Sequence, residues 1–209
     1  MNQYGNPQYW EERYTREQDQ FDWYQRFSGI RDQVLSHINP ETKILNVGSG
    51  SSRLSEEMFD EGYQNITNID FSMVVTKQMQ ERYKDQGPNF KYIQMDVRNM
   101  EFDSKSFDCV IDKGLLDSVL CGESQTTNAN KMLQEIHRVL TEKGVYIVLT
   151  HGTSEFRKPV LQKPEFQWDI QEFKIIKPQI SDNPGKEFLD KYQLYICKKN
   201  EGNIVEKQE

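Results

Sequence analysis

Two glycines, Gly48 and Gly50, directly follow a short apolar run, residues 44–47. Such a run, bounded by turn-forming residues, predicts a buried strand, and glycines after it let a ligand approach the backbone closely. A second apolar run, residues 66–69, ends in Asp70, 20 residues after Gly50. A carboxylate at the tip of a second strand can accept hydrogen bonds from both ribose hydroxyls. Gly-x-Gly also occurs in ordinary tight turns, but together these features predict a nucleoside site.

The residue at the third glycine position separates two kinds of cofactor. In a nicotinamide dinucleotide site, this glycine lets the helix pack closely while the pyrophosphate lies at the helix N-terminus. Here the position holds Arg53, which has a long side chain. S-adenosylmethionine has no pyrophosphate, and its sites tolerate the change. The loop therefore favours S-adenosylmethionine as the cofactor.

Other polar residues stand at the ends of later predicted strands. Asp96 follows residues 90–93, where it could accept from an adenine amino group or cap a turn. Lys113 follows residues 107–111; a lysine there either points into solvent or pairs with a ligand carboxylate as a point charge. His151 follows residues 145–150 and is either a turn cap or a candidate proton acceptor.

The N-terminal segment is rich in aromatic residues, including Trp10, Tyr14 and Trp23. A helix is expected over residues 27–38, ending before Pro40. One interpretation is a helix pair fixed to the domain by aromatic burial. The other is a lid whose rings cover a cationic cofactor, since a sulfonium is attracted to an aromatic face.

Strands and helices alternate along most of the chain. Helical spacing follows Ser52, Ser72 and residue 128, and the strands are those named above. At the end, residues 159–164 are expected to be a loop, and two strands, residues 167–176 and 192–198, have no helix between them. The predicted fold is α/β, with a doubly wound, mostly parallel, seven-stranded sheet, an antiparallel C-terminal strand and a helical N-terminal extension. The expected organisation is an extension of 1–40, a domain of 41–198 and a polar tail of 199–209.

The composition limits the class of protein. The chain has 209 residues and a formal net charge of −7, which argues against a generic nucleic-acid binder. No apolar run reaches the roughly 20 residues of a membrane span, so no membrane association is expected. The three cysteines, Cys109, Cys121 and Cys197, have no metal-ligand spacing. We expect reduced thiols, no bound metal, and a cytoplasmic monomer.

The motifs together resemble the class I, seven-stranded S-adenosylmethionine-dependent methyltransferases. Within these, the chain is most similar to the methyltransferase-like group that contains the lysine methyltransferases of eukaryotic translation elongation factor 1-alpha. The resemblance covers about residues 9–198. It is carried by Tyr9-Trp-x-x-Arg-Tyr14, Asp22-Trp23-Tyr24, Gly48-x-Gly50-x-Ser52, Asp70-Phe71-Ser72, Met95-Asp96-Val97, residues 107–117 with Lys113-Gly-x-Leu-Asp117, and Phe156-Arg157.

The resemblance implies a role for each matching position. Gly48 would lie under the methionine part of the donor, and Gly50 of the same loop would also belong to the donor site. Asp70 and Phe71 would hold the ribose and flank the adenine, and Asp96 and Val97 would take the adenine edge. Lys113 would complete the donor pocket with three aromatic residues of the extension, Trp10, Tyr14 and Trp23.

The expected reaction is methyl transfer to a protein lysine, with translation elongation factor 1-alpha as a possible partner. A lysine of pKa near 10.4 is only ~0.1% neutral at pH 7.4, so the acceptor must lose a proton. Asp112, Asp117 and Glu123 are candidates to bind its ammonium, and Lys113, Asp112 and Asp117 are the candidate catalytic residues. Two alternatives remain open: a small-molecule methyltransferase, and a non-catalytic scaffold. Asn46 and Ser52, which depart from the common class I pattern, keep the scaffold open.

Overall fold

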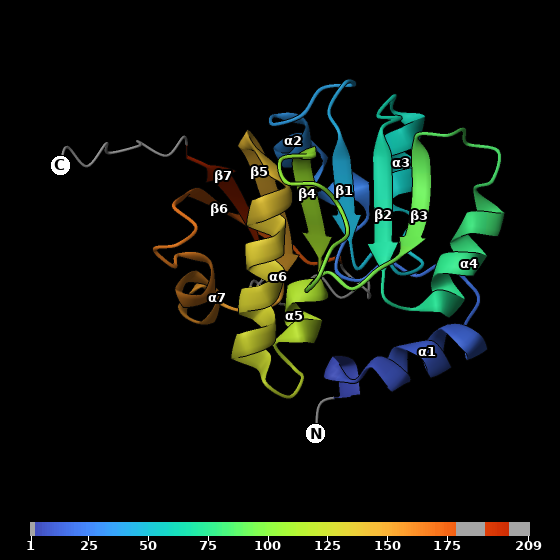
Figure 1. The fold of residues 1–209 in the computed structure, drawn as a ribbon, viewed down its shortest axis with the longest axis horizontal. Coiled ribbons are helices and arrows are strands. Elements are labelled where there is room, and N and C mark those ends of the chain that lie inside the picture. Colours follow the sequence, from blue (N-terminus) through green and yellow to red (C-terminus); the bar gives the residue numbers. More distant parts are fainter. Residues whose placement is uncertain (1–2, 179–190, 201–209) are drawn as a thin grey trace, which may run out of the picture.

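The computed structural model describes residues 3–178 and 191–200. Their core is a seven-stranded sheet in the order β3-β2-β1-β4-β5-β7-β6 (Figure 1). The strands are β1 (Ile44–Val47), β2 (Ile66–Asp70), β3 (Phe90–Gln94), β4 (Phe107–Lys113), β5 (Leu140–Thr150), β6 (Trp168–Ile176) and β7 (Lys191–Lys199).

The direction of the strands matches the sequence prediction. β1 to β5 pair in parallel, and β7 runs antiparallel to both of its neighbours, β5 and β6. The chain builds outward from β1 to β3 on one side and continues with β4 on the other. In open α/β sheets, ligands bind at the carboxyl ends of the strands beside such a reversal of strand order. The topology therefore places a binding site between β1 and β4.

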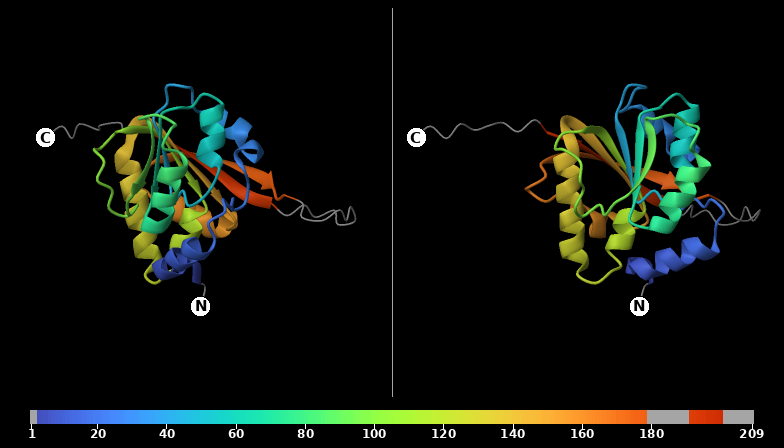
Figure 2. Two further views of the ribbon diagram at one scale, coloured as in Figure 1. Left: turned by 90° about the vertical axis from the view of Figure 1, so that its right-hand side faces the viewer. Right: turned by 45° about the vertical axis from the view of Figure 1, so that its right-hand side comes forward.

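Helices cover both faces of the sheet (Figure 2). The helices α2 (Arg31–Leu35), α3 (Leu54–Asp60) and α4 (Met73–Arg82) contribute to one buried cluster, and α5 (Leu115–Val119), α6 (Gln125–Val139) and α7 (Ser154–Leu161) contribute to the other. Successive side chains of a strand point to opposite faces, so Ile44 of β1 belongs to the first cluster and Leu45 to the second. Burial on both faces explains why β1 is apolar at nearly every position.

Three parts of the chain differ from the sequence expectation. The predicted helix over residues 27–38 is a 3₁₀ turn, Phe27–Gly29, followed by the short α2. Residues 154–161 form α7 although Pro159 lies inside it, because burial of Arg157 and Leu161 holds the segment against the sheet. The predicted tail begins one residue too early: Lys199 is the last residue of β7, and its ammonium donates to two backbone carbonyls of residues 137 and 140.

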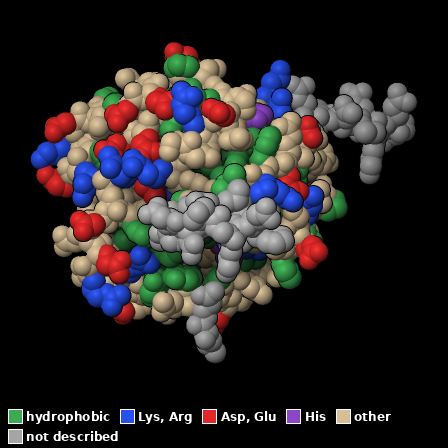
Figure 3. All heavy atoms as spheres, turned by 180° about the vertical axis from the view of Figure 1, so that it is seen from behind, with side chains coloured by type: hydrophobic (Ala, Val, Ile, Leu, Met, Phe, Trp, Pro, Cys, Tyr) green, Lys and Arg blue, Asp and Glu red, His purple; other side chains and the backbone are tan. Residues whose placement is uncertain are grey.

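The surface of the described residues carries charges of both signs. Over the face shown in Figure 3, basic and acidic side chains are interspersed, with hydrophobic atoms between them. Among the described residues, no helix is both long enough and apolar enough to cross a membrane.

The N-terminal helix α1 (Pro7–Arg16) lies beyond the carboxyl ends of the central strands (Figures 1 and 2). It follows a 3₁₀ turn, Gln3–Gly5, and begins with a proline whose missing N–H costs nothing at that position. The Asn6 side chain accepts from the backbone N–H of Gln8 and caps the helix. The sequence prediction of a helical extension is confirmed.

One carboxylate fixes α1 to α4. Glu11 accepts from the hydroxyl of Ser72 and from the backbone N–H of Met73, each at 3.0 Å. These groups form the N-terminus of α4, where the helix dipole favours a negative charge. The Gln78 side chain of α4 also donates to the backbone carbonyl of Tyr14 at 3.0 Å.

We predict that Glu11→Ala releases α1 from α4 while the rest of the fold persists. Hydrogen bonds to a charged group contribute roughly 1.5–3 kcal/mol each, which corresponds to at least tenfold faster amide exchange in residues 7–16. Hydrogen–deuterium exchange with peptide resolution measures this change. The matched control is Glu12→Ala, because Glu12 is exposed and contacts only the side chain of Gln8 within the described residues. Equal exchange in the two variants would contradict the anchoring role of Glu11.

Candidate active site

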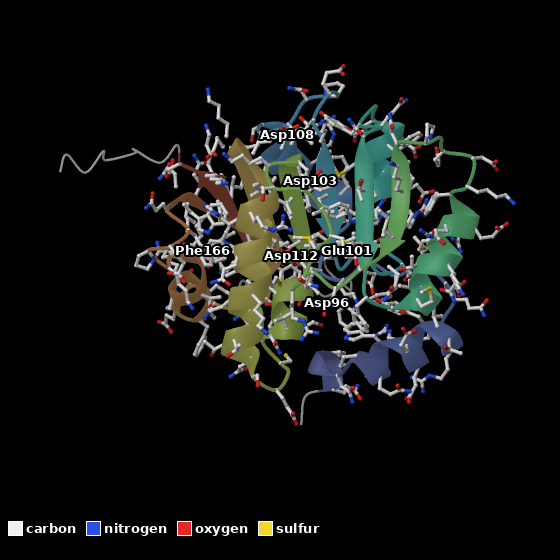
Figure 4. All side chains as sticks on the ribbon, in the orientation of Figure 1. Asp96, Glu101, Asp103, Asp108, Asp112 and Phe166 are labelled. Carbon is white, nitrogen blue, oxygen red and sulfur yellow. The ribbon has the colours of Figure 1, made fainter. Side chains whose placement is uncertain are left out.

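A cavity of about 660 Å³ lies at the carboxyl ends of the central strands, with α1 forming part of its wall. Its lining comes from the loops after β1, β2, β3, β4 and β5 and from residues 4–24 of the extension. This volume is typical of sites for cofactors and small ligands. Figure 4 shows Asp96 near the strand ends that face α1 and Asp108 near the opposite ends of the strands. The site therefore lies where the strand order predicts it.

The loop after β1 needs both of its glycines. Gly48 and Gly50 have φ angles of +60° and +51°, in the left-handed region that favours glycine. A Cβ on Gly48 would lie 2.8 Å from Cβ of Leu115, and a Cβ on Gly50 would lie 2.7 Å from the hydroxyl of Tyr14. Larger residues would therefore push α5 or α1 away from the loop.

Asp70 closes this loop from the tip of β2. Its carboxylate accepts from the backbone N–H of Gly50 and from that of Ser72, both at 2.9 Å. Burial raises the pKa of Asp70 to about 6, although the two backbone hydrogen bonds oppose the shift. Asp70 lines the cavity, and a carboxylate has further lone pairs for ligand hydroxyls.

The residues expected at the adenine also line the cavity: Phe71, Asp96 and Val97. Val97 is buried, whereas the Asp96 side chain is 43% exposed and forms an ion pair with Arg98 at 2.7 Å. Burial opposes ionisation of Asp96, but hydrogen bonds from Arg98 outweigh it and lower the pKa. The structure thus brings these residues to the position that the sequence predicted.

Lys113 has a partner within the protein. Its ammonium lies 3.1 Å from Asp22 and donates to the backbone carbonyl of Trp23 at 2.9 Å. The side chain is only 5% exposed, and burial lowers its pKa, although Asp22 opposes the shift. Lys113 lines the cavity as predicted, but its charge is already balanced, so it joins the extension to β4 more than it offers a free charge to a ligand.

A second cation of the cavity wall, Arg13, was not singled out from the sequence, although it lies within the Tyr9-Trp-x-x-Arg-Tyr14 motif. Its guanidinium carbon lies 5.0 Å from the ring centroid of Trp23 and 6.0 Å from that of Trp10. Five N–H donors leave capacity for a carboxylate beside the contacts with Tyr9 and Glu17. Arg13 is therefore better placed than Lys113 to hold the donor's carboxylate.

The three predicted aromatic residues form one cluster at the cavity. Trp10 stacks on Tyr14 with ring centroids 5.9 Å apart, and Trp23 meets Trp10 edge to face at 6.2 Å. All three line the cavity. The same cluster of rings therefore both fixes the extension to the domain and forms a cover over the ligand cavity. Both interpretations of the extension describe part of the structure.

Two of the carboxylates proposed for catalysis stand away from the cavity. Asp112 is fully buried and accepts from the backbone N–H groups of Leu115 and Leu116 and from the hydroxyl of Tyr146. It fixes the start of α5, and burial raises its pKa to about 7. Asp112 and the exposed Glu123 are absent from the described lining, which contradicts the direct contact with an acceptor that the sequence suggested.

Asp117 is the carboxylate that does reach the cavity. It is 3% exposed and accepts from four side chains, which are Tyr24, Thr150, His151 and Arg157. Burial opposes its ionisation, but the hydrogen bonds and the Arg157 guanidinium outweigh burial and lower its pKa. The expected acid is in place, held ionised at the cavity wall by residues from four segments.

The cavity wall fits S-adenosylmethionine. Asp70 suits ribose hydroxyls, the ring cluster suits a sulfonium, and Arg13 suits a carboxylate. Within the described residues, the buried Ser49 hydroxyl of the glycine loop has no hydrogen-bond partner, which marks a place for a polar ligand group. Asn46 and Ser52, which depart from the common class I pattern, are bound within the protein: Asn46 to Ser55, and Ser52 to Asp22.

We predict that donor binding depends on the ionised form of Asp70. Asp70→Asn should weaken S-adenosylmethionine binding about 100-fold, because two charge-assisted hydrogen bonds contribute roughly 1.5–3 kcal/mol each. Because the pKa is raised, wild-type affinity should fall as the pH decreases through about 6, where the carboxyl takes up a proton. Calorimetric titration at pH 5 to 8 measures both effects. The exposed Asp60→Asn variant is the matched control, and a pH-independent wild-type affinity would refute the assignment.

We also predict which cation holds the carboxylate of the donor. Arg13→Gln should lower the affinity for S-adenosylmethionine at least tenfold, since a hydrogen bond to a charged group contributes roughly 1.5–3 kcal/mol. Decarboxylated S-adenosylmethionine lacks the group in question, so the variant should bind this analogue nearly as well as the wild type does. An equal loss with both ligands would mean that Arg13 acts only through packing.

Comparison with known proteins gives the family. Residues 38–207 match a methyltransferase domain family. The "eEF1A lysine and N-terminal methyltransferase" of Bos taurus is 40% identical over 151 residues, which is 71% of this chain and 22% of that protein. The "EEF1A lysine methyltransferase 4" of Mus musculus is 35% identical over 179 residues, which is 81% of this chain and 70% of that protein. The chain thus spans less than a quarter of the length of the first relative and most of the second.

Solved structures agree on the fold. The methyltransferase in the complex with the Trm112 activator of Haloferax volcanii has a TM-score of 0.68, 13% identity, and coverage of 92% of this chain and 95% of that chain. An S-adenosylmethionine-dependent methyltransferase of Methanosarcina mazei has a TM-score of 0.63, 16% identity, and coverage of 86% and 99%. Together these findings confirm the predicted fold, enzyme class and methyl donor: the chain belongs to the class I S-adenosylmethionine-dependent methyltransferases, in the group that includes the EEF1A lysine methyltransferases.

Proposed function

We propose that this enzyme methylates a lysine side chain of a protein, with translation elongation factor 1-alpha as the substrate. The observation that carries the proposal is Asp117, an ionised carboxylate at the cavity wall. Tyr24 and His151, which also line the cavity, bind this carboxylate. We call Tyr24, Asp117 and His151 the acceptor group.

The electrostatics of the acceptor group suit a cationic substrate. A lysine approaches as an ammonium ion, and a nearby carboxylate attracts it. The Tyr24 hydroxyl donates to Asp117 at 2.7 Å, and its oxygen retains lone pairs that face the same cavity. The formal net charge of −7 also favours association with a basic protein.

The donor supplies an activated methyl group, so the protein has mainly to place the acceptor in line and to make it neutral. A lysine of pKa near 10.4 is ~0.1% neutral at pH 7.4, which corresponds to a deficit of about 4 kcal/mol. A cavity that excludes water favours the neutral amine, because burial disfavours the charged form. The half-buried aromatic cluster of the extension provides such an environment.

The substrate proposal also rests on the relatives. Those reported above have names that give them activity on eEF1A, on a lysine in both cases and on an N-terminus in one. A lysine side chain is therefore the first expectation for this chain, and an N-terminal amine is the alternative that the experiment must separate. We further propose that the enzyme acts as a cytoplasmic monomer.

We predict that the purified enzyme transfers labelled methyl groups from S-adenosylmethionine to a lysine of purified translation elongation factor 1-alpha. Mass spectrometry of the digested product locates the modified residue. Asp70→Asn is the control for transfer that does not use the donor site, and it should reduce labelling about 100-fold when the donor is present well below its dissociation constant.

The other outcomes are equally informative. If only the N-terminal amine were labelled, the methyl acceptor would be an α-amine and not a lysine side chain. Label in small molecules of a cell extract, with none in protein, would make the chain a small-molecule methyltransferase. Donor binding without any transfer in the extract would support the scaffold alternative.

A further inference from the structure

Three histidines occur in the chain, and His151 is the one that lines the cavity. It directly follows β5, and its side chain is 54% exposed. Its Nδ1 lies 2.9 Å from Asp117 and 3.1 Å from the hydroxyl of Tyr24. The backbone N–H of His151 also donates to Asp117, at 3.0 Å. Hydrogen bonds to Asp117 and Tyr24 thus fix the ring of His151, while the rest of the ring is open to the cavity.

These contacts define the tautomer of the ring. An ionised carboxylate accepts only, so Nδ1 carries the proton and donates it to Asp117. Nε2, on the other edge of the ring, then carries a lone pair. Within the described residues Nε2 has no hydrogen-bond partner. The ring is thus oriented as a proton acceptor, as in other sites where a carboxylate fixes a histidine.

The backbone around Tyr24 supports the same arrangement. Tyr24 has a φ of +63°, which a bulky side chain rarely adopts and which is found most often at functional sites. Gly114, with a φ of +94°, makes room for its ring, since a Cβ there would lie 3.0 Å from the ring of Tyr24. Burial is the main cause that raises the pKa of Tyr24, and the negative charge of Asp117 is the second. The Tyr24 hydroxyl therefore keeps its proton and donates a hydrogen bond to Asp117.

The other groups at this corner are poor proton acceptors. Asp117 already accepts several hydrogen bonds, and its lowered pKa makes it a weak base. Lys113 is held by Asp22. The remaining titratable or charged groups here are Arg157 of α7, which binds Asp117, and Tyr192 of β7, which packs on Tyr24 with centroids 4.7 Å apart and lies under Lys177 of the segment after β6. To these are added Asp112, which is fully buried away from the cavity, and Cys121, whose pKa is raised by burial so that it stays a thiol. His151 is left as the base.

We propose that His151 is the general base that removes the proton from the acceptor amine, and that Asp117 is the residue that positions it. One N–H bond of the ammonium breaks, and the proton forms a bond with Nε2 of His151. The neutral amine then attacks the methyl carbon of the donor, and the electron pair of the breaking C–S bond goes to sulfur, leaving S-adenosylhomocysteine. The exposed face of His151 releases the proton to solvent. This inference rests on the proposed lysine acceptor.

The test compares the pH dependence of kcat/KM for wild type and His151→Ala, with elongation factor 1-alpha and labelled donor as substrates. General bases contribute 10²–10⁴-fold, so the variant should lose about 100-fold at pH 7.5. Wild-type kcat/KM should depend less steeply on pH than that of the variant, because the base takes the proton from the ammonium directly and the reaction does not wait for a free neutral amine. In the variant it should continue to rise about tenfold per pH unit, following the neutral fraction of the lysine, so that the deficit shrinks towards pH 9.5.

Three controls separate a proton-transfer role from a structural one. Donor affinity by calorimetry should be unchanged in His151→Ala, because the side chain is half exposed and is not expected to contact the donor. The variant should still be folded by circular dichroism, although it loses one hydrogen bond to Asp117 and its melting temperature falls accordingly. Added imidazole should restore part of the activity. His37→Ala, a half-buried histidine away from the cavity, should match the wild type at every pH.

The outcomes distinguish the two proposals. A wild type that labels lysine, together with a His151→Ala variant that is fully active or that has a pH-independent deficit without imidazole rescue, would overturn the role of His151 and leave the proposed function standing. A wild type that labels no lysine would overturn the proposed function and this inference together.

Discussion

The ion pair between Asp22 and Lys113 is the interaction through which the active site becomes a single unit. Asp22 lies in the extension and Lys113 at the end of β4, and both side chains are almost fully buried. Asp22 also accepts from the hydroxyl of Ser52 in the loop after β1. One carboxylate thus joins three separate segments at the reversal of strand order. Loss of either partner would leave an uncompensated buried charge, which is strongly destabilising, so closure of the extension and formation of the donor site are coupled.

Four aspartates lie at the carboxyl ends of the central strands, and their different surroundings give the same carboxyl group different roles. Asp70 and Asp112 are buried and have no cationic partner within the part of the chain that the structure describes, and their pKa values are raised to about 6 and about 7. Asp96 and Asp117 have Arg98 and Arg157 beside them, and their pKa values are lowered. Both members of the first pair organise backbone, at the glycine loop and at α5, and Asp70 also lines the cavity, whereas the second pair remains ionised at the cavity wall. Position relative to the strand tip alone does not separate these roles.

The donor side and the acceptor side of the cavity are built differently. The donor side uses backbone geometry, positive φ angles and aromatic faces, which suit one constant ligand. The acceptor side uses side chains from the extension, from β5 and the residue after it, and from α7, which converge on Asp117 of α5.

The sequence by itself determined the sheet, its antiparallel strand, the glycine loop and the place of Asp70. Short apolar runs, turn residues and strand–helix alternation are local signals, and parallel strands bring their ends to one edge of the sheet regardless of detail. The aromatic extension and the methyltransferase motifs were equally visible. Asn46 and Ser52, which kept a non-catalytic scaffold open at the sequence level, are accommodated by partners within the fold.

Only the tertiary structure decided what each side chain binds. Asp112 and Asp117 are five residues apart, yet one faces Tyr146 inside the core and the other faces the cavity, because α5 turns the chain between them. Lys113 pairs with Asp22 from a segment 91 positions earlier, whereas Arg13 lines the cavity with its guanidinium beside the rings of Trp10 and Trp23. Residues 154–161 became a helix despite Pro159, since burial of Arg157 and Leu161 outweighs one missing hydrogen bond. Pairing of charges and burial depend on contacts between distant segments, and no local pattern of residues encodes them.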